Sequence, residues 1–166
     1  MRLSIQTLVC ACALGAAASA LAGTVAVSFI DPASYTDAGN SRWDEDANLK
    51  ALASHLQALG RRRLPAEQSL KVEVLDVDLA GTMRPSRRGG TDRRVVRGKT
   101  DWPRIKLRYQ LASNGQLIRK GEELVADMDF THGVDPVHRT EPLYYERHML
   151  DQWFSARFVA NSAPAH

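Results

Sequence analysis

Cysteine is nearly absent from this 166-residue sequence, which has only two, at positions 10 and 12. Long apolar runs are absent as well, because the one apolar stretch, over 8–18, is shorter than the ~20 residues of a membrane-spanning helix. Neither sign of charge dominates, with 22 Lys and Arg against 19 Asp and Glu, so a charged binding surface must come from local clustering. This composition is that of a globular protein, and it excludes collagen-like, low-complexity and multi-pass membrane chains.

The N-terminus has the pattern of a secretory signal peptide. Arg2 gives a positive start, the apolar stretch follows, and Ala20 and Ala22 are small residues at the positions that a signal peptidase reads. We expect residues 1–22 to be cleaved, with cleavage after Ala20 as the alternative, and the mature chain, 23–166, to be exported as one domain. Both cysteines are then lost, which excludes disulfides, thiolate catalysis and cysteine metal sites.

Hydrophobic periodicity predicts the order strand, helix, strand, strand, strand, helix. Alternating apolar residues predict strands over 24–30, 70–80, 105–111 and 117–130. Leucines three and four residues apart predict a helix over 44–59 that ends at Gly60, and Thr140 is the expected cap of a last, aromatic-rich helix. Both helices are expected to cover one face of a mostly antiparallel sheet whose other face is polar. The expected fold class is therefore α+β, a two-layer sandwich.

Local patterns predict the details of two strand regions. The alternation changes phase at Val74–Leu75, which indicates a β-bulge there. Asn114–Gly115 predicts a type I′ hairpin turn, because both central residues of that turn need positive φ. Gly121 is a second expected bulge, and the simple hairpin register places Lys106 opposite Glu123.

The densest positive charge lies between two predicted strands, and its candidate site residues are Arg84, Arg87, Arg88, Arg93, Arg94 and Arg97. Glycines and a proline among them predict a flexible loop over about 82–100. A guanidinium holds phosphate or carboxylate through two parallel hydrogen bonds, so these arginines predict contact with an anionic partner. The alternative is a solvated loop whose charge only keeps the protein soluble. Nucleic acid is disfavoured, because no aromatic residues alternate with the arginines to stack on bases.

Two carboxylate pairs are the strongest candidates for catalysis. Asp76 and Asp78, and likewise Asp127 and Asp129, share a strand face, so adjacent strands would bring four carboxylates together around calcium or shared protons. The alternative is an exposed polar face where Arg and Lys pair with them. Histidines between 132 and 148 lack a zinc spacing, and no serine-hydrolase, Walker or dinucleotide motif occurs. The sequence therefore predicts no catalytic residue, metal site or cofactor.

Five stretches together form a specific pattern: 29–39 (FIDPASYTDAG), 72–81 (VEVLDVDLAG), 101–111 (DWPRIKLRYQL), 121–128 (GEELVADM) and 141–154 (EPLYYERHMLDQWF). On these stretches, which span nearly all of the mature chain, the sequence resembles an uncharacterised family of small exported proteobacterial proteins, domain-of-unknown-function family 3016. The resemblance implies a periplasmic protein of a Gram-negative bacterium and carries over no activity, cofactor or catalytic residue. The arginine-rich region falls between the matching stretches, so its function could be particular to this protein.

These observations favour a periplasmic, non-catalytic binding or accessory module that contacts an anionic envelope component or a protein partner. One alternative is a metal-dependent or acid/base hydrolase that uses the sheet carboxylates. The other is a structural envelope protein without a ligand. The mature chain is expected to have no transmembrane segment, and the sequence makes no prediction of its oligomeric state.

Overall fold

The computed structural model describes residues 23–85, 93–97, 100–132, 138 and 141–160. The elements follow in the order β1 (Thr24–Phe29), a short 3-10 helix η1 (Pro32–Ser34), α1 (Arg42–Arg63), β2 (Gln68–Asp78), β3 (Thr82–Arg84), β4 (Arg93–Val95), β5 (Arg104–Ser113), β6 (Gln116–Ala126), α2 (Tyr144–Phe154) and a π-helical turn η3 (Ser155–Val159).

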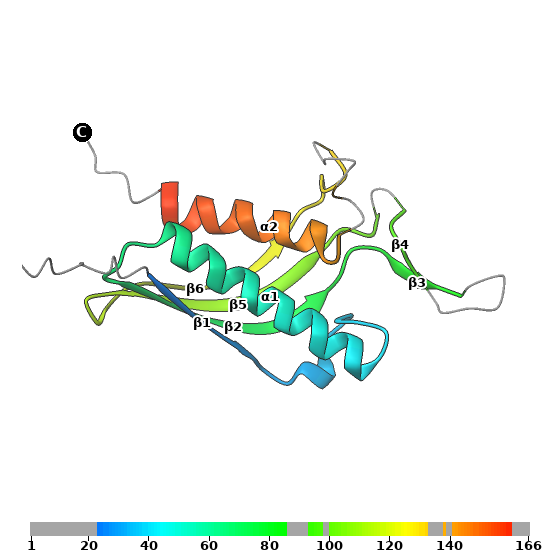
Figure 1. Ribbon diagram of the computed structural model, residues 1–166, viewed down its shortest axis with the longest axis horizontal. Coiled ribbons are helices and arrows are strands. Elements are labelled where there is room, and N and C mark those ends of the chain that lie inside the picture. Colours follow the sequence, from blue (N-terminus) through cyan, green and yellow to red (C-terminus); the bar gives the residue numbers. More distant parts are fainter. Residues whose placement is uncertain (1–22, 86–92, 98–99, 133–137, 139–140, 161–166) are drawn as a thin grey trace, which may run out of the picture.

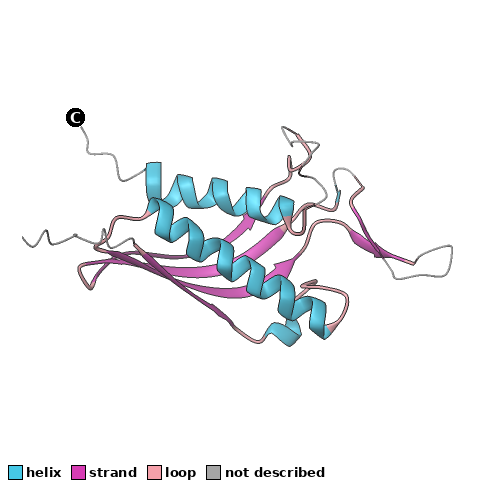
Figure 2. Ribbon diagram, in the orientation of Figure 1, coloured by secondary structure: helices cyan, strands magenta, loops and turns pink. Residues whose placement is uncertain are grey.

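The main sheet has the strand order β1-β2-β5-β6, with β1 parallel to β2 and the other pairs antiparallel. Helices α1 and α2 lie side by side on one face of this sheet (Figures 1 and 2). The α+β sandwich expected from the sequence is therefore confirmed. Strands β3 and β4 form a separate two-stranded sheet, which projects beyond one end of the main sheet and occupies part of the expected 82–100 loop. No helix in the described ranges is long and apolar enough to cross a membrane.

Helix α1 is longer than the periodicity predicted. It begins after Ser41, whose side-chain oxygen accepts a hydrogen bond from the backbone N–H of Asp44, which is a standard N-cap. The predicted leucine stripe is confirmed, because all four leucines face the core. Gly60, expected to end the helix, is instead inside it. A Cβ at Gly60 would lie 2.3 Å from a Val25 methyl carbon, so the glycine is there to let β1 approach the helix.

The bulge predicted in β2 is confirmed. Val74 pairs with Leu107 and Asp76 with Lys106, so Leu75 is the extra residue. Because one residue is left out of the ladder, the apolar residues on both sides of the bulge can face the same core. Leu70, Val72, Val74, Val77 and Leu79 are all buried.

The β5–β6 hairpin confirms the turn and corrects the register. Asn114 and Gly115 have φ of 49° and 78°, as a type I′ turn requires. The bulge, however, lies at Ile118, between the residues that pair with Ala112 and Leu111, and not at Gly121. This extra residue shifts the ladder by one position.

The shifted register changes which side chains face each other. Lys106 lies opposite Leu124, and Glu123 lies opposite Leu107 on the face covered by the helices. The predicted pairing of Lys106 with Glu123 is therefore wrong. The ammonium group of Lys106 pairs with Glu122 instead, at 3.2 Å.

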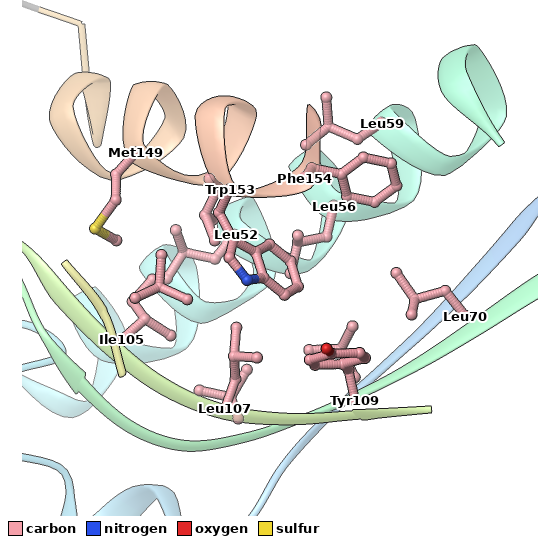
Figure 3. Packing of buried hydrophobic residues seen from close by; sticks show 14 of the residues in the cluster. Leu52, Leu56, Leu59, Leu70, Ile105, Leu107, Tyr109, Met149, Trp153 and Phe154 are labelled. Atoms are coloured by element: carbon pink, nitrogen blue, oxygen red, sulfur yellow. The ribbon is translucent and has the colours of Figure 1, made fainter. Parts of the chain in front are cut away.

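Helix α2 begins later than expected, and the prediction of a Thr140 cap is wrong. Leu143 occupies the N-cap position with φ of 56°, makes no side-chain cap and packs against the core. Thr140 itself lies outside the described residues. The expected role of this helix in the core is confirmed, since Met149, Trp153 and Phe154 are all buried. Trp153 points toward the sheet and lies above Tyr109 (Figure 3).

Candidate functional site

A cleft of about 690 Å³ lies at the end of the domain that carries the β3–β4 hairpin. Its walls come from the first turns of α1 and α2 and from the hairpin, three segments that meet beyond the ends of the sheet strands (Figure 1). Trp43, Arg94 and Glu146 line this cleft.

Arg94 fastens the hairpin to the rest of the domain. Its two terminal nitrogens donate to the two carboxylate oxygens of Asp37, each at 2.8 Å, and Nη1 also donates to the carbonyl of Gly81 at 3.2 Å. Burial opposes the charge of Arg94, but the hydrogen bonds and charge of Asp37 outweigh burial and raise its pKa. Arg94 therefore carries a permanent positive charge that Asp37 already neutralises.

The position of Asp37 follows from backbone hydrogen bonds to the end of β2. Its N–H donates to the carbonyl of Val77 at 2.8 Å, and its carbonyl accepts from the N–H of Leu79 at 3.0 Å. The loop before α1 is thus held as a short extension of the sheet. Asp37 was not among the residues singled out in the sequence, because its partner is 57 positions away.

Glu146 is the buried carboxyl of the cleft, only 3% exposed. Its Oε1 accepts a hydrogen bond from the N–H of Ala80 at 2.7 Å, which ties the first turn of α2 to the segment after β2. Burial raises the pKa of Glu146, while the Ala80 hydrogen bond and the charge of Arg94 act in the opposite direction. Glu146 and Arg94 therefore hold the same backbone segment from two sides.

Trp43 is the most exposed large apolar side chain of the described chain, at 82%. It lies in the first turn of α1, nine residues before Leu52, which is two and a half helical turns and therefore the opposite face from the core. Its indole therefore presents a large apolar surface, with a polar N–H, that the core of the domain does not use. The position of Trp43 off the leucine stripe is the signal in the sequence that points to this exposure.

The six candidate arginines do not all meet. Arg84 is exposed on β3, and Arg97 is exposed after β4, where its backbone N–H donates to Asp101. Arg93 lies in β4, but its side chain is outside the described part, as are Arg87 and Arg88 entirely. Arg94 is the one member of the set that lines the cleft among the residues described.

The carboxylate pairs of the sheet do not converge. Strand β5 separates β2 from β6, and Asp127 and Asp129 lie after β6 has ended. Asp76 accepts hydrogen bonds from the backbone and side chain of Thr36, and Asp78 forms an ion pair with Arg104. The adjacency that a shared calcium or proton site would need is therefore absent.

The histidines have local partners. His132 pairs with Asp129 and His138 with Glu141, each three residues away. His148 accepts or donates a hydrogen bond with Gln152 at 2.8 Å. Among the residues that the structure describes, no three His, Asp or Glu side chains are placed to hold a metal ion.

Comparison with known families assigns this chain to a family. Residues 23–156 match the model of the family described as "Protein of unknown function (DUF3016)". The chain belongs to this family. The match includes the cleft and both of its helices, so the cleft of this family member is built from residues that the family model covers. No curated protein and no solved structure matches the chain.

Proposed function

We propose that this DUF3016 protein is an exported, periplasmic binding module that performs no catalysis and contacts an anionic component of the cell envelope at its cleft end. Export is supported by the signal-peptide pattern of residues 1–22 and by the family match, which begins at residue 23, directly after the expected cleavage site.

The observation that carries this proposal is the exposure of Trp43 at the end of the domain whose hairpin carries exposed arginines without an ion pair to any described carboxylate. Arg42, Arg84 and Arg97 are exposed and make no ion pair with any described residue. By contrast, three arginines elsewhere are paired: Arg104 with Asp78, Arg108 with Glu73 and Glu122, and Arg157 with Glu123.

The cleft end therefore combines exposed guanidinium groups with an exposed indole. An unpaired guanidinium supplies donors for phosphate or carboxylate, and an exposed indole supplies a large apolar surface for the neighbouring part of the same partner. Arg94 contributes by holding the hairpin in place, because Asp37 already occupies its donors. The proposed contact therefore uses Trp43, Arg84 and Arg97, while Arg94 positions them.

The first test is photo-crosslinking in the periplasm of the producing bacterium. Trp43→p-benzoylphenylalanine places the crosslinker at the rim of the cleft, and Arg61→p-benzoylphenylalanine places it at the opposite end of α1 as a matched control. We expect an adduct from position 43 and none from position 61. Equal adducts at both positions, or none at 43, would remove the cleft end as the contact.

The second test asks whether the contact is electrostatic. The double variant Arg84→Ser/Arg97→Ser should weaken the crosslink at position 43 and reduce its sensitivity to salt, because exposed charges are screened at high ionic strength. Arg61→Ser/Arg62→Ser removes the same charge from the far end of α1 and should change nothing. If the two double variants behave alike, the partner is not recognised by charge at the hairpin.

A further inference from the structure

Strand β6 is an open edge of the main sheet. Among the described residues, the strand order β1-β2-β5-β6 leaves one side of β6 without a neighbouring strand, and β6 is 11 residues long. Edge strands of this length present free backbone donors and acceptors, on which another strand can pair. The side chains of β6 indicate which strand that is.

The side chains of β6 change the sign of their charge at Gly121, and apolar residues lie at both ends of the strand. Before the glycine come two apolar and then two basic residues, and after it come two acidic and then two apolar residues: Leu117, Ile118, Arg119, Lys120, Gly121, Glu122, Glu123, Leu124 and Val125. In an antiparallel pair centred on Gly121, each residue lies opposite the one equally far on the other side of the glycine. Lys120 of one copy then faces Glu122 of the other, and Arg119 faces Glu123.

The two charge pairs also lie on matching faces of the sheet. Lys120 and Glu122 lie opposite Gln110 and Arg108, on the face away from the helices. Arg119 and Glu123 lie opposite Leu111 and Leu107, which point into the core beneath α1 and α2. Opposite-charge pairs directly across an antiparallel ladder stabilise it, and here both faces have them.

The apolar ends of β6 are exposed in the single chain. Leu117, Ile118 and Leu124 are 54%, 53% and 63% exposed, and they are three of the few large apolar side chains that the described surface exposes to this extent. The same antiparallel pairing brings Leu124 of one copy against Leu117 and Ile118 of the other. Because Ile118 is the bulged residue, this contact is a patch and not a strict ladder pair.

The basic residues of β6 have no carboxylate partner among the described residues of their own chain. Lys120 makes no ion pair with the described residues, and the Arg119 guanidinium donates to the backbone carbonyl of Arg157. Glu123 lies on a groove of about 460 Å³ between β6 and α2, and its side chain stays 21% exposed even though Tyr109, Trp153 and Arg157 donate to its carboxylate. This groove leaves the carboxylate accessible to an arginine from a second copy.

We propose that two copies of this chain pair antiparallel through β6 about a two-fold axis at Gly121, which joins two four-stranded sheets into one. A row of like charges would prevent such pairing, and that is how many edge strands are protected. Here the sign of charge changes at the axis, so a two-fold symmetric contact places opposite signs together. The proposal is independent of the binding function of the cleft, which lies at another part of the domain.

The test uses residues 23–166, with the oligomeric state measured by sedimentation velocity over a concentration series. Lys120→Glu and Glu122→Lys should each give a monomer, because each variant places like charges opposite each other at two symmetric positions. We expect each to weaken dimerisation by about tenfold or more. Lys50→Glu, a matched charge reversal on the exposed side of α1, should leave the dimer unchanged.

Mixing the two single variants provides the decisive control. In the mixed pair, each position 120 again faces the opposite charge at position 122 of the other chain, so the mixture should form dimers although neither variant does alone. This result also shows that both variants are folded. A monomeric wild type overturns the proposal, as does a dimer that neither variant weakens. A mixture that stays monomeric overturns the pairing about Gly121.

Discussion

Arg94 and Asp37 face each other through two parallel hydrogen bonds of 2.8 Å, although 57 residues separate them in the chain. Asp37 is fixed to the end of β2, and Arg94 lies on the second strand of the projecting hairpin. The pair therefore determines where the hairpin sits relative to the cleft.

Loss of the two hydrogen bonds between Arg94 and Asp37 should destabilise the protein. Both side chains are about one quarter exposed, so the pair is weaker than a fully buried one, and we expect Arg94→Ala to cost about 2 kcal/mol of unfolding free energy. Arg94→Lys keeps the charge but loses the two-point geometry, and should cost about 1 kcal/mol. Urea unfolding measures both, with Arg97→Ala as the exposed control at about 0.5 kcal/mol or less. Equal effects of the Ala variants at 94 and 97 would contradict the prediction.

The buried carboxyl of Glu146 should make stability depend on pH. Because burial raises its pKa above the ordinary 4.5, the folded chain keeps this proton to a higher pH than the unfolded chain. The stability that the protonated group contributes is complete below its unfolded pKa and is lost as pH rises through the folded pKa.

Glu146→Gln tests this dependence, since the amide oxygen can still accept from Ala80 and does not titrate. We expect the unfolding free energy of the variant, relative to wild type, to increase as pH rises from about 4 to about 8. The exposed control Glu67→Gln should show a smaller change. A difference that falls with rising pH would show that ionised Glu146 stabilises the fold.

His55 and Asp151 join the two helices through a contact of 3.0 Å. Burial lowers the pKa of His55 below 6.5, while the charge and hydrogen bond of Asp151 partly offset this effect. Asp151→Asn should therefore lower the pKa of His55 further, as measured by an NMR titration of the imidazole. Asp46→Asn, on the exposed side of α1, is the control. Because the folded pKa is lowered, this histidine costs stability as pH falls below 6.5.

Tyr109 lies over Gly121 and leaves no room for a side chain there. A Cβ at Gly121 would be 3.0 Å from both a ring carbon and the hydroxyl oxygen of Tyr109. We expect Gly121→Ala to lower the unfolding free energy by about 1–3 kcal/mol through overpacking. The penalty should shrink in a Tyr109→Leu background, which a double-mutant cycle measures. A penalty that stays the same in both backgrounds would indicate a backbone effect instead.

Local chemistry along the chain was sufficient to predict much of this fold. The leucine repeat, the Asn114–Gly115 turn and the phase change at Val74–Leu75 each involve neighbouring residues whose backbone preferences do not depend on distant contacts. These features therefore led to the order of the four main-sheet strands and the two helices, and to the α+β class, but not to the β3–β4 hairpin, which was expected as a loop. The family resemblance also rested on such local stretches.

The roles of two glycines and the register of the β5–β6 hairpin were harder to predict, because packing between distant segments decides them. Gly60 and Gly121 were expected to end a helix and to form a bulge, but each is required by a side chain from another element, Val25 and Tyr109. The bulge at Ile118 moved every later pair of the hairpin by one position, and so placed Glu123 under α2. An alternating apolar pattern reveals a bulge only where the alternation changes phase. Where the pattern stays the same, the sequence does not show that one residue is left out of the ladder.

The sequence by itself determined the elements of this protein, its charge clusters and its expected export. Only the tertiary structure decided that Arg94 is neutralised by Asp37, that Trp43 stands exposed at a cleft, and that Glu146 is buried beside them. These outcomes depend on contacts between segments far apart in the chain. The physical reason is that an ionic or aromatic side chain has no role until the fold determines its neighbours and its exposure to water.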